Sequence, residues 1–111
     1  MTIINTNELN CAALDWAVAK CEGYTGVALQ ERSGGGWYSP STNWAQGGPI
    51  IEREKISVEC KHDGWWVASY QYNYSDDKEN LQLAENPLIA ALRCYVASKL
   101  GDEVDIPHEL I

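Results

Sequence analysis

The side chains that most often carry catalysis are few in this chain, and their spacing favours structural roles. Glu52 and Glu54 could form a general acid/base pair, but they flank Arg53, so ion pairing at a loop end is the better prediction. His62 stands beside a predicted tight turn and His108 in the C-terminal tail, and two isolated histidines do not make a metal site. No Gly-x-Ser-x-Gly nucleophile elbow is present. We therefore expect no enzyme, no metal and no cofactor.

The cysteines and the one glycine run also lack a catalytic or redox pattern. Cys11 and Cys21 fall on one predicted helix, roughly 15 Å apart, which is too far for a disulfide. Cys60 and Cys94 lie in apolar runs, where a free thiol behaves as a small hydrophobe. The stretch 33–36 (Ser-Gly-Gly-Gly) lacks the lysine and the strand-to-helix setting of a phosphate-binding loop. These features favour a reduced, cytoplasmic protein.

The segment 33–49 combines glycines, large aromatic side chains and hydrogen-bonding groups, and its composition argues against a helix or a buried strand. Aromatic rings are costly to leave in water, so they must pack on the domain or on a partner. The rings could stack on a planar ligand whose edges are read by amide and hydroxyl groups. Alternatively, the aromatics anchor a long loop and the polar groups close its turns. The candidate binding residues of this segment are Trp37, Tyr38, Ser41, Asn43, Trp44 and Gln46.

The bulk composition predicts one domain, spanning residues 1–111, that avoids nucleic acid and membranes. The net charge is −8, with eight scattered basic residues, so neither phosphate tracking nor binding to anionic lipid is expected. The N-terminus shows no secretion signal, and no apolar run reaches transmembrane length. An acidic inhibitor that mimics DNA stays possible, although the acidic residues alternate with basic ones.

The N-terminal half is predicted to hold a buried helix and a short strand. A helix over about 6–22 carries Glu8, Asp15 and Glu22 as one acidic stripe on an otherwise apolar surface. Residues 27–30 read as a strand. Residues 49–53 read as a single helical turn that opens with its proline.

A β-hairpin is predicted around Asp63-Gly64, with strands at 55–62 and 65–74. A two-residue turn there pairs Cys60 with Val67. That register gives a core face of Ile56, Val58, Cys60, Trp65 and Val67. The opposite face carries Trp66 and Tyr70 among charged side chains, and these two aromatics join the candidate binding surface.

The C-terminal part is predicted to be a solvated loop at 74–85, a helix and a tail. Asn86 caps the helix, Pro87 takes its first position and Gly101 ends it. The tail packs back through Val104, Ile106 and Leu110. The fold class is therefore α+β: a small antiparallel sheet of about three strands, flanked by N-terminal and C-terminal helices.

Three stretches of the chain resemble the NinX-like family of small phage and prophage proteins, also described as a phage alpha-beta-alpha sandwich domain. The first is Leu14-Asp15-Trp16-Ala17-Val18-Ala19-Lys20 with Glu22-Gly23. The second is Tyr38-Ser39-Pro40-Ser41 with Trp44-Ala45-Gln46-Gly47-Gly48-Pro49-Ile50-Ile51-Glu52. The third is Asn86-Pro87-Leu88-Ile89-Ala90-Ala91 with Arg93 and Tyr95-Val96-Ala97-Ser98-Lys99-Leu100-Gly101. The resemblance implies a phage origin and a sheet flanked by helices. It implies no activity and no site residues.

The functional prediction is non-catalytic binding by a phage accessory protein in the host cytoplasm. Its partner would be a host protein or a small metabolite, contacted through the segment 33–49, and the oligomeric state stays open. One alternative is a nucleotide-sequestering protein that stacks bases on its aromatic rings. Others are a small enzyme and the acidic DNA mimic.

Overall fold

The computed structural model describes residues 2–24, 38–61, 63–70 and 81–110, and it has an α+β fold. The strand expected at 27–30 lies outside these residues. The elements in chain order are β1 (Thr2–Asn5), η1 (Thr6–Glu8), α1 (Cys11–Cys21), α3 (Trp44–Glu54), β2 (Ile56–Cys60), β3 (Trp66–Tyr70), β4 (Gln82–Ala84), α4 (Pro87–Leu100), β5 (Glu103–Ile106) and η3 (His108–Leu110).

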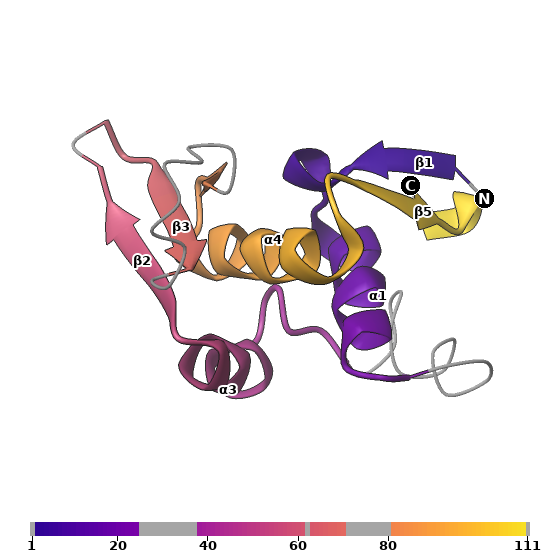
Figure 1. Ribbon diagram of the computed structural model, residues 1–111, viewed down its shortest axis with the longest axis horizontal. Coiled ribbons are helices and arrows are strands. Elements are labelled where there is room, and N and C mark those ends of the chain that lie inside the picture. Colours follow the sequence, from indigo (N-terminus) through magenta and orange to yellow (C-terminus); the bar gives the residue numbers. More distant parts are fainter. Residues whose placement is uncertain (1, 25–37, 62, 71–80, 111) are drawn as a thin grey trace.

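Helix α4 is the centre of the molecule. In Figure 1 it runs horizontally, with β2, β3 and β4 at one end, β1 and β5 at the other, and α1 and α3 below. The predicted caps are confirmed: the Asn86 side chain accepts hydrogen bonds from the backbone N–H groups of Leu88 and Ile89, Pro87 begins the helix, and Gly101 ends it at φ 90°. Most of its side chains are small or apolar, and the helix is buried against both helices and both sheets.

The β2–β3 hairpin forms as predicted, but its register is shifted by one residue. Lys61 N–H donates to the Trp65 carbonyl, and Gly64, at φ 91°, closes a turn one residue longer than the predicted one. Cys60 therefore pairs with Trp66 instead of Val67. A one-residue slip turns every side chain to the other face.

The slip exchanges the predicted faces of β3. Trp66, Ala68 and Tyr70 pack on the core, whereas Trp65 is exposed and Val67 lies on the outward face. The prediction of Val67 and Trp65 as core residues was wrong, and so was the outward face assigned to Trp66 and Tyr70. Strand β4, within the predicted loop, pairs with β3 and completes a sheet ordered β2-β3-β4.

A second, two-stranded sheet pairs the first strand with the last, and no strand was predicted for either segment. Strands β1 and β5 are antiparallel, with Ile4 opposite Val104. The ladder continues where Thr6 N–H donates to the Asp102 carbonyl and the Thr6 hydroxyl donates to the Gly101 carbonyl. Val104 and Ile106 are buried, so the tail packs back through these residues as predicted.

The first helix is shorter than predicted, because residues 6–8 form the separate 3-10 helix η1 and Leu9 and Asn10 are extended. Arg93 Nε donates to the Leu9 carbonyl at 2.6 Å, so a tertiary contact holds the break between η1 and α1. Helix α1 is buried on nearly all sides, and this includes Asp15. The predicted acidic stripe is therefore wrong at its middle residue.

Helix α3 begins at Trp44 and includes Gly47 and Gly48, where a loop was predicted, and it contains the helical turn predicted at 49–53. Pro49 is exposed and lies early in the helix, so the backbone bond that it cannot make leaves the exposed Ala45 carbonyl to water. Gly47 is required by packing: a Cβ there would lie 2.5 Å from the Pro40 carbonyl oxygen and 2.6 Å from a Leu88 methyl carbon. The absence of a side chain allows α3 to approach α4 closely.

Candidate functional site

Three polar residues of the predicted binding loop make hydrogen bonds within the domain. Ser41 is buried, and its N–H donates to Asp15 Oδ1 at 2.8 Å. Asn43 caps α3 by accepting from Ala45 N–H, and Gln46 Oε1 accepts from Ser39 N–H at 2.6 Å. These contacts favour the alternative in which the segment is anchored as structure.

The aromatic residues of the same segment separate into buried and exposed groups. Tyr38 is only 8% exposed and packs edge-to-face on Tyr24, with 5.5 Å between ring centroids. Burial raises the pKa of the Tyr38 phenol above its ordinary value. Trp44 remains 55% exposed, and Trp37 lies outside the described residues. Trp44 therefore keeps an accessible ring beside the start of α3.

Tyr70 belongs to a hydrogen-bonded group beneath the sheet. Its hydroxyl donates to Glu54 Oε1 at 3.2 Å and lies 3.0 Å from the Ser98 hydroxyl. Burial raises the Tyr70 pKa to about 12, so the phenol stays protonated at neutral pH. Tyr70 thus ties β3 to α3 and α4. Trp66 packs against the core on the same face.

Arg53 connects three helices through a two-point ion pair. Its Nη1 and Nη2 donate to the two Glu22 carboxylate oxygens at 3.0 and 2.8 Å, and its Nε donates to Glu54 at 3.1 Å. Tyr95 donates to Glu22 at 2.6 Å, and the Arg53 guanidinium lies over the Tyr95 ring. The guanidinium and phenol hold the pKa of Glu22 below its ordinary value. The predicted ion pairing of Arg53 with Glu54 is confirmed.

The outward face of the sheet carries an apolar strip. Val67 on β3 lies opposite Leu83 on β4, and Leu83 is 53% exposed. Leu81 and Trp65 are also exposed. A shallow groove of about 200 Å³ runs along this face. Its lining residues are Ser57, Glu59, Lys61, Val67, Ser69, Leu81 and Leu83.

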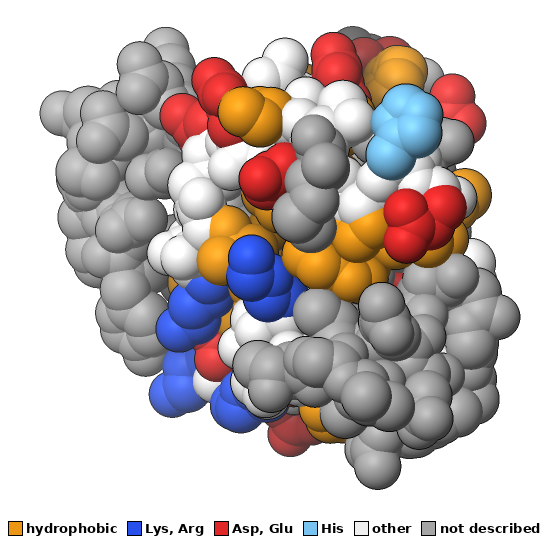
Figure 2. Space-filling model, turned by 90° about the vertical axis from the view of Figure 1, so that its right-hand side faces the viewer, with side chains coloured by type: hydrophobic (Ala, Val, Ile, Leu, Met, Phe, Trp, Pro, Cys, Tyr) orange, Lys and Arg blue, Asp and Glu red, His pale blue; other side chains and the backbone are white. Residues whose placement is uncertain are grey.

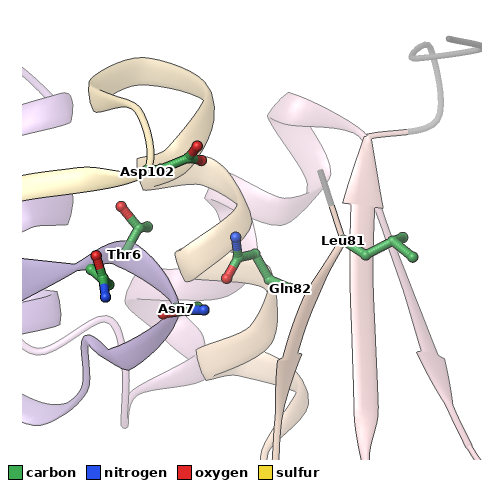
Figure 3. Close-up of a pocket in the computed structure, with 6 residues that line it drawn as sticks. Thr6, Asn7, Leu81, Gln82 and Asp102 are labelled. Carbon is green, nitrogen blue, oxygen red and sulfur yellow. The ribbon is translucent and has the colours of Figure 1, made fainter. Parts of the chain in front are cut away.

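A polar cleft of about 420 Å³ lies between η1, the start of β4 and the turn after α4 (Figure 3). It is lined by Asn5, Thr6, Asn7, Leu81, Gln82 and Asp102. In Figure 3 the Gln82 amide projects from β4 toward Thr6 and Asn7, while the Leu81 side chain points away. Gln82 is only 5% exposed, and its Oε1 has no hydrogen-bond partner within the described structure. An unpaired buried acceptor is uncommon in native proteins.

Sequence reasoning missed both of these surfaces because it read residues 74–85 as loop. The available signal was the alternation of Leu81, Gln82, Leu83 and Ala84, which has the two-residue period of a strand. The orientation of this strand is unusual. Leu83 faces outward, and Gln82 faces inward.

Histidine, cysteine and carboxylate side chains occur throughout the part of the chain that the structure describes. Within these residues, histidine, cysteine and carboxylate side chains form no cluster that could hold a metal ion. Cys94 is buried as predicted, but Cys60 is exposed. On the face carrying β1 and β5, acidic, basic and apolar side chains all appear, so this face is not uniformly acidic (Figure 2). No helix in the described ranges is long and apolar enough to span a bilayer.

The fold and these surfaces define a small α+β protein with two antiparallel sheets arranged around one central helix. The family model described as "Bacteriophage P22, NinX" matches residues 5–99, and the chain belongs to this family. The phage family predicted from the three sequence stretches is thus confirmed. A comparison with curated proteins finds no match.

Proposed function

We propose that this phage accessory protein is a non-catalytic binding protein that captures a protein of the host cytoplasm. The observation that carries the proposal is the outward apolar strip of Trp65, Val67, Leu81 and Leu83. Large apolar side chains that gather on a surface usually mark a contact with another macromolecule. The contact surface is then the sheet face, with Trp44 as a second, separate candidate.

The shape and edge of this face favour a protein partner over a small metabolite. Its groove of about 200 Å³ is smaller than the roughly 300–1,000 Å³ of typical small-molecule pockets. Glu59 and Lys61 border the apolar strip, and protein interfaces commonly have an apolar centre with a charged rim.

The test compares capture of host proteins by wild type and Leu83→Asp, using immobilised protein, increasing amounts of host lysate and quantitative mass spectrometry. A specific partner should saturate the wild type and bind Leu83→Asp at least about tenfold more weakly, because a charge would be buried at the centre of the contact. Unchanged retention of every saturating protein would contradict the proposal.

Ile3→Asp is the matched control. Ile3 is an apolar strand residue, 65% exposed, that lies on the other sheet and gains the same charge. This variant should capture the partner as wild type does. A Trp44→Ala variant tests the second surface: selective loss of capture there, with Leu83→Asp unaffected, would move the contact to the start of α3.

A further inference from the structure

The inward face of β4 carries a feature that the proposed protein contact does not use. Gln82 Oε1 is a buried acceptor without a partner in the described structure, and it borders the polar cleft. Leaving such an acceptor unpaired destabilises a folded protein. A bound ligand that donates a hydrogen bond to Gln82 Oε1 would remove this destabilisation.

The groups around Gln82 define the ligand that the cleft accepts. The Thr6 hydroxyl is already donating to the Gly101 carbonyl at 2.6 Å. Asp102 adds a carboxylate at the exposed side of the cleft, and the lining includes no basic residue. A ligand with several N–H donors and a positive charge complements the unpaired Gln82 oxygen and the Asp102 carboxylate.

Nearby basic groups do not satisfy the free acceptor. Arg93 reaches this part of the molecule from α4, but its Nε and Nη1 donate to the carbonyls of Leu9 and Leu83. Burial lowers the pKa of Arg93, yet an arginine remains charged at neutral pH. These donors of Arg93 therefore bond to backbone carbonyls of Leu9 and Leu83 and not to Gln82 Oε1. The overall charge of −8 favours the approach of cations.

We propose that the cleft between η1, β4 and the turn after α4 binds an ammonium or guanidinium group, with Gln82 Oε1 accepting from an N–H donor and Asp102 pairing with the charge. The side chains of Asn5 and Asn7 supply further amide groups along the wall. This site is separate from the proposed protein contact, although Leu81 borders both.

The test titrates isotope-labelled full-length protein with agmatine, which carries both cationic groups, and follows amide chemical shifts by NMR. Shifts that saturate and centre on residues 5–7, 82 and 102 are expected. Ribose and acetate, at matched ionic strength, should produce no saturating shifts there. Absence of saturation with agmatine up to about 20 mM, or stronger binding of acetate, would overturn the proposal.

Two variants separate ligand recognition from folding. Gln82→Met keeps side-chain length without the buried acceptor, so it should bind agmatine at least about tenfold more weakly and melt no lower than wild type. A clear fall in its melting temperature would show that Oε1 has a structural partner, and the proposal would fail. Asp102→Asn should weaken binding several-fold. Asp105→Asn removes an exposed carboxylate outside the cleft and should leave binding unchanged.

Two further measurements identify the source of the cation and the independence of the site. If N-acetyl-argininamide binds as tightly as agmatine, the cationic group can come from a protein side chain. Tighter binding of agmatine would instead assign the cationic group to a free small molecule. Either result supports the proposed chemistry. Leu83→Asp should retain agmatine binding, so failure of the protein contact and failure of the cleft are distinguishable.

Discussion

At the scale of single residues, burial decides which reactive groups are available. Cys94 is 2% exposed and Cys21 half-buried, and burial raises both thiol pKa values to about 12. Cys11 and Cys60 are exposed. The four thiols should therefore differ strongly in reactivity, because the thiolate is the reacting form.

We expect Ellman's reagent at pH 8 to label two thiols rapidly in the native protein and all four in denaturant. The fast thiols are Cys11 and Cys60. A Cys60→Ser variant should lose one fast equivalent, and Cys94→Ser should lose none. If Cys94→Ser lost one of the fast-reacting thiols, Cys94 would be accessible in the native protein, and this would contradict its buried position in α4.

Single residues also explain why much of the predicted binding loop is anchored to the domain. Tyr38, Ser41 and Gln46 have partners within the domain, whereas Trp44 stays 55% exposed. Their partners are Asp15, Ser39 and Tyr24, which composition cannot reveal because contacts between distant residues depend on the fold. Whether the segment also binds a partner through Trp44 stays a prediction.

At the scale of elements, local signals predicted some boundaries well and others poorly. Helix α4 was predicted closely, because Asn86, Pro87 and Gly101 act through the local backbone. The hairpin register was missed, since Asp63-Gly64 suits both a two-residue turn and the longer turn observed. The β1–β5 sheet pairs residues about one hundred positions apart, and no local pattern encodes that pairing.

Helix α3 provides a test of close packing with two adjacent glycines. Gly47→Ala should lower the free energy of unfolding by about 1–3 kcal/mol, because its Cβ would overlap the Pro40 carbonyl oxygen and Leu88. Gly48→Ala is the control: its Cβ would meet only Trp44, at 3.9 Å, and alanine favours a helix by roughly 0.5–1 kcal/mol. Urea denaturation measures both. Equal effects at the two positions would contradict the observed contact of α3 with α4.

At the scale of the whole molecule, β4 connects the two proposed binding functions. Its Leu83 faces outward to the sheet groove, and its Gln82 borders the polar cleft. A strand that only stabilised the core would place the leucines inward and the glutamine outward. This inverted orientation agrees with the proposed surface and cleft, and the Arg93 bond to the Leu83 carbonyl holds β4 in place.

The stability of the whole domain should depend on pH through two carboxyl groups with opposite effects. Arg53 and Tyr95 lower the pKa of Glu22 below its ordinary 4.5, so this group stabilises the folded state above that pH and loses its contribution as pH falls through the folded value. Burial raises the pKa of Asp15 above its ordinary 3.8, against the hydrogen bonds from Ser41. Protonation of Asp15 therefore favours the folded state as pH falls.

Two isosteric variants separate these opposite contributions. Between pH 6 and pH 3.5, the free energy of unfolding should fall less in Glu22→Gln than in wild type, and more in Asp15→Asn. The Glu22 difference should be roughly 0.5–1 kcal/mol, because Arg53 is half exposed and solvent screens the pair. Urea titrations at several pH values measure how the free energy of unfolding changes with pH. In a double variant the two changes should be nearly additive, because the two carboxylates share no hydrogen-bond partner among the described contacts. If both single variants changed the slope in the same direction, the opposite environments of these two carboxyl groups would be disproved.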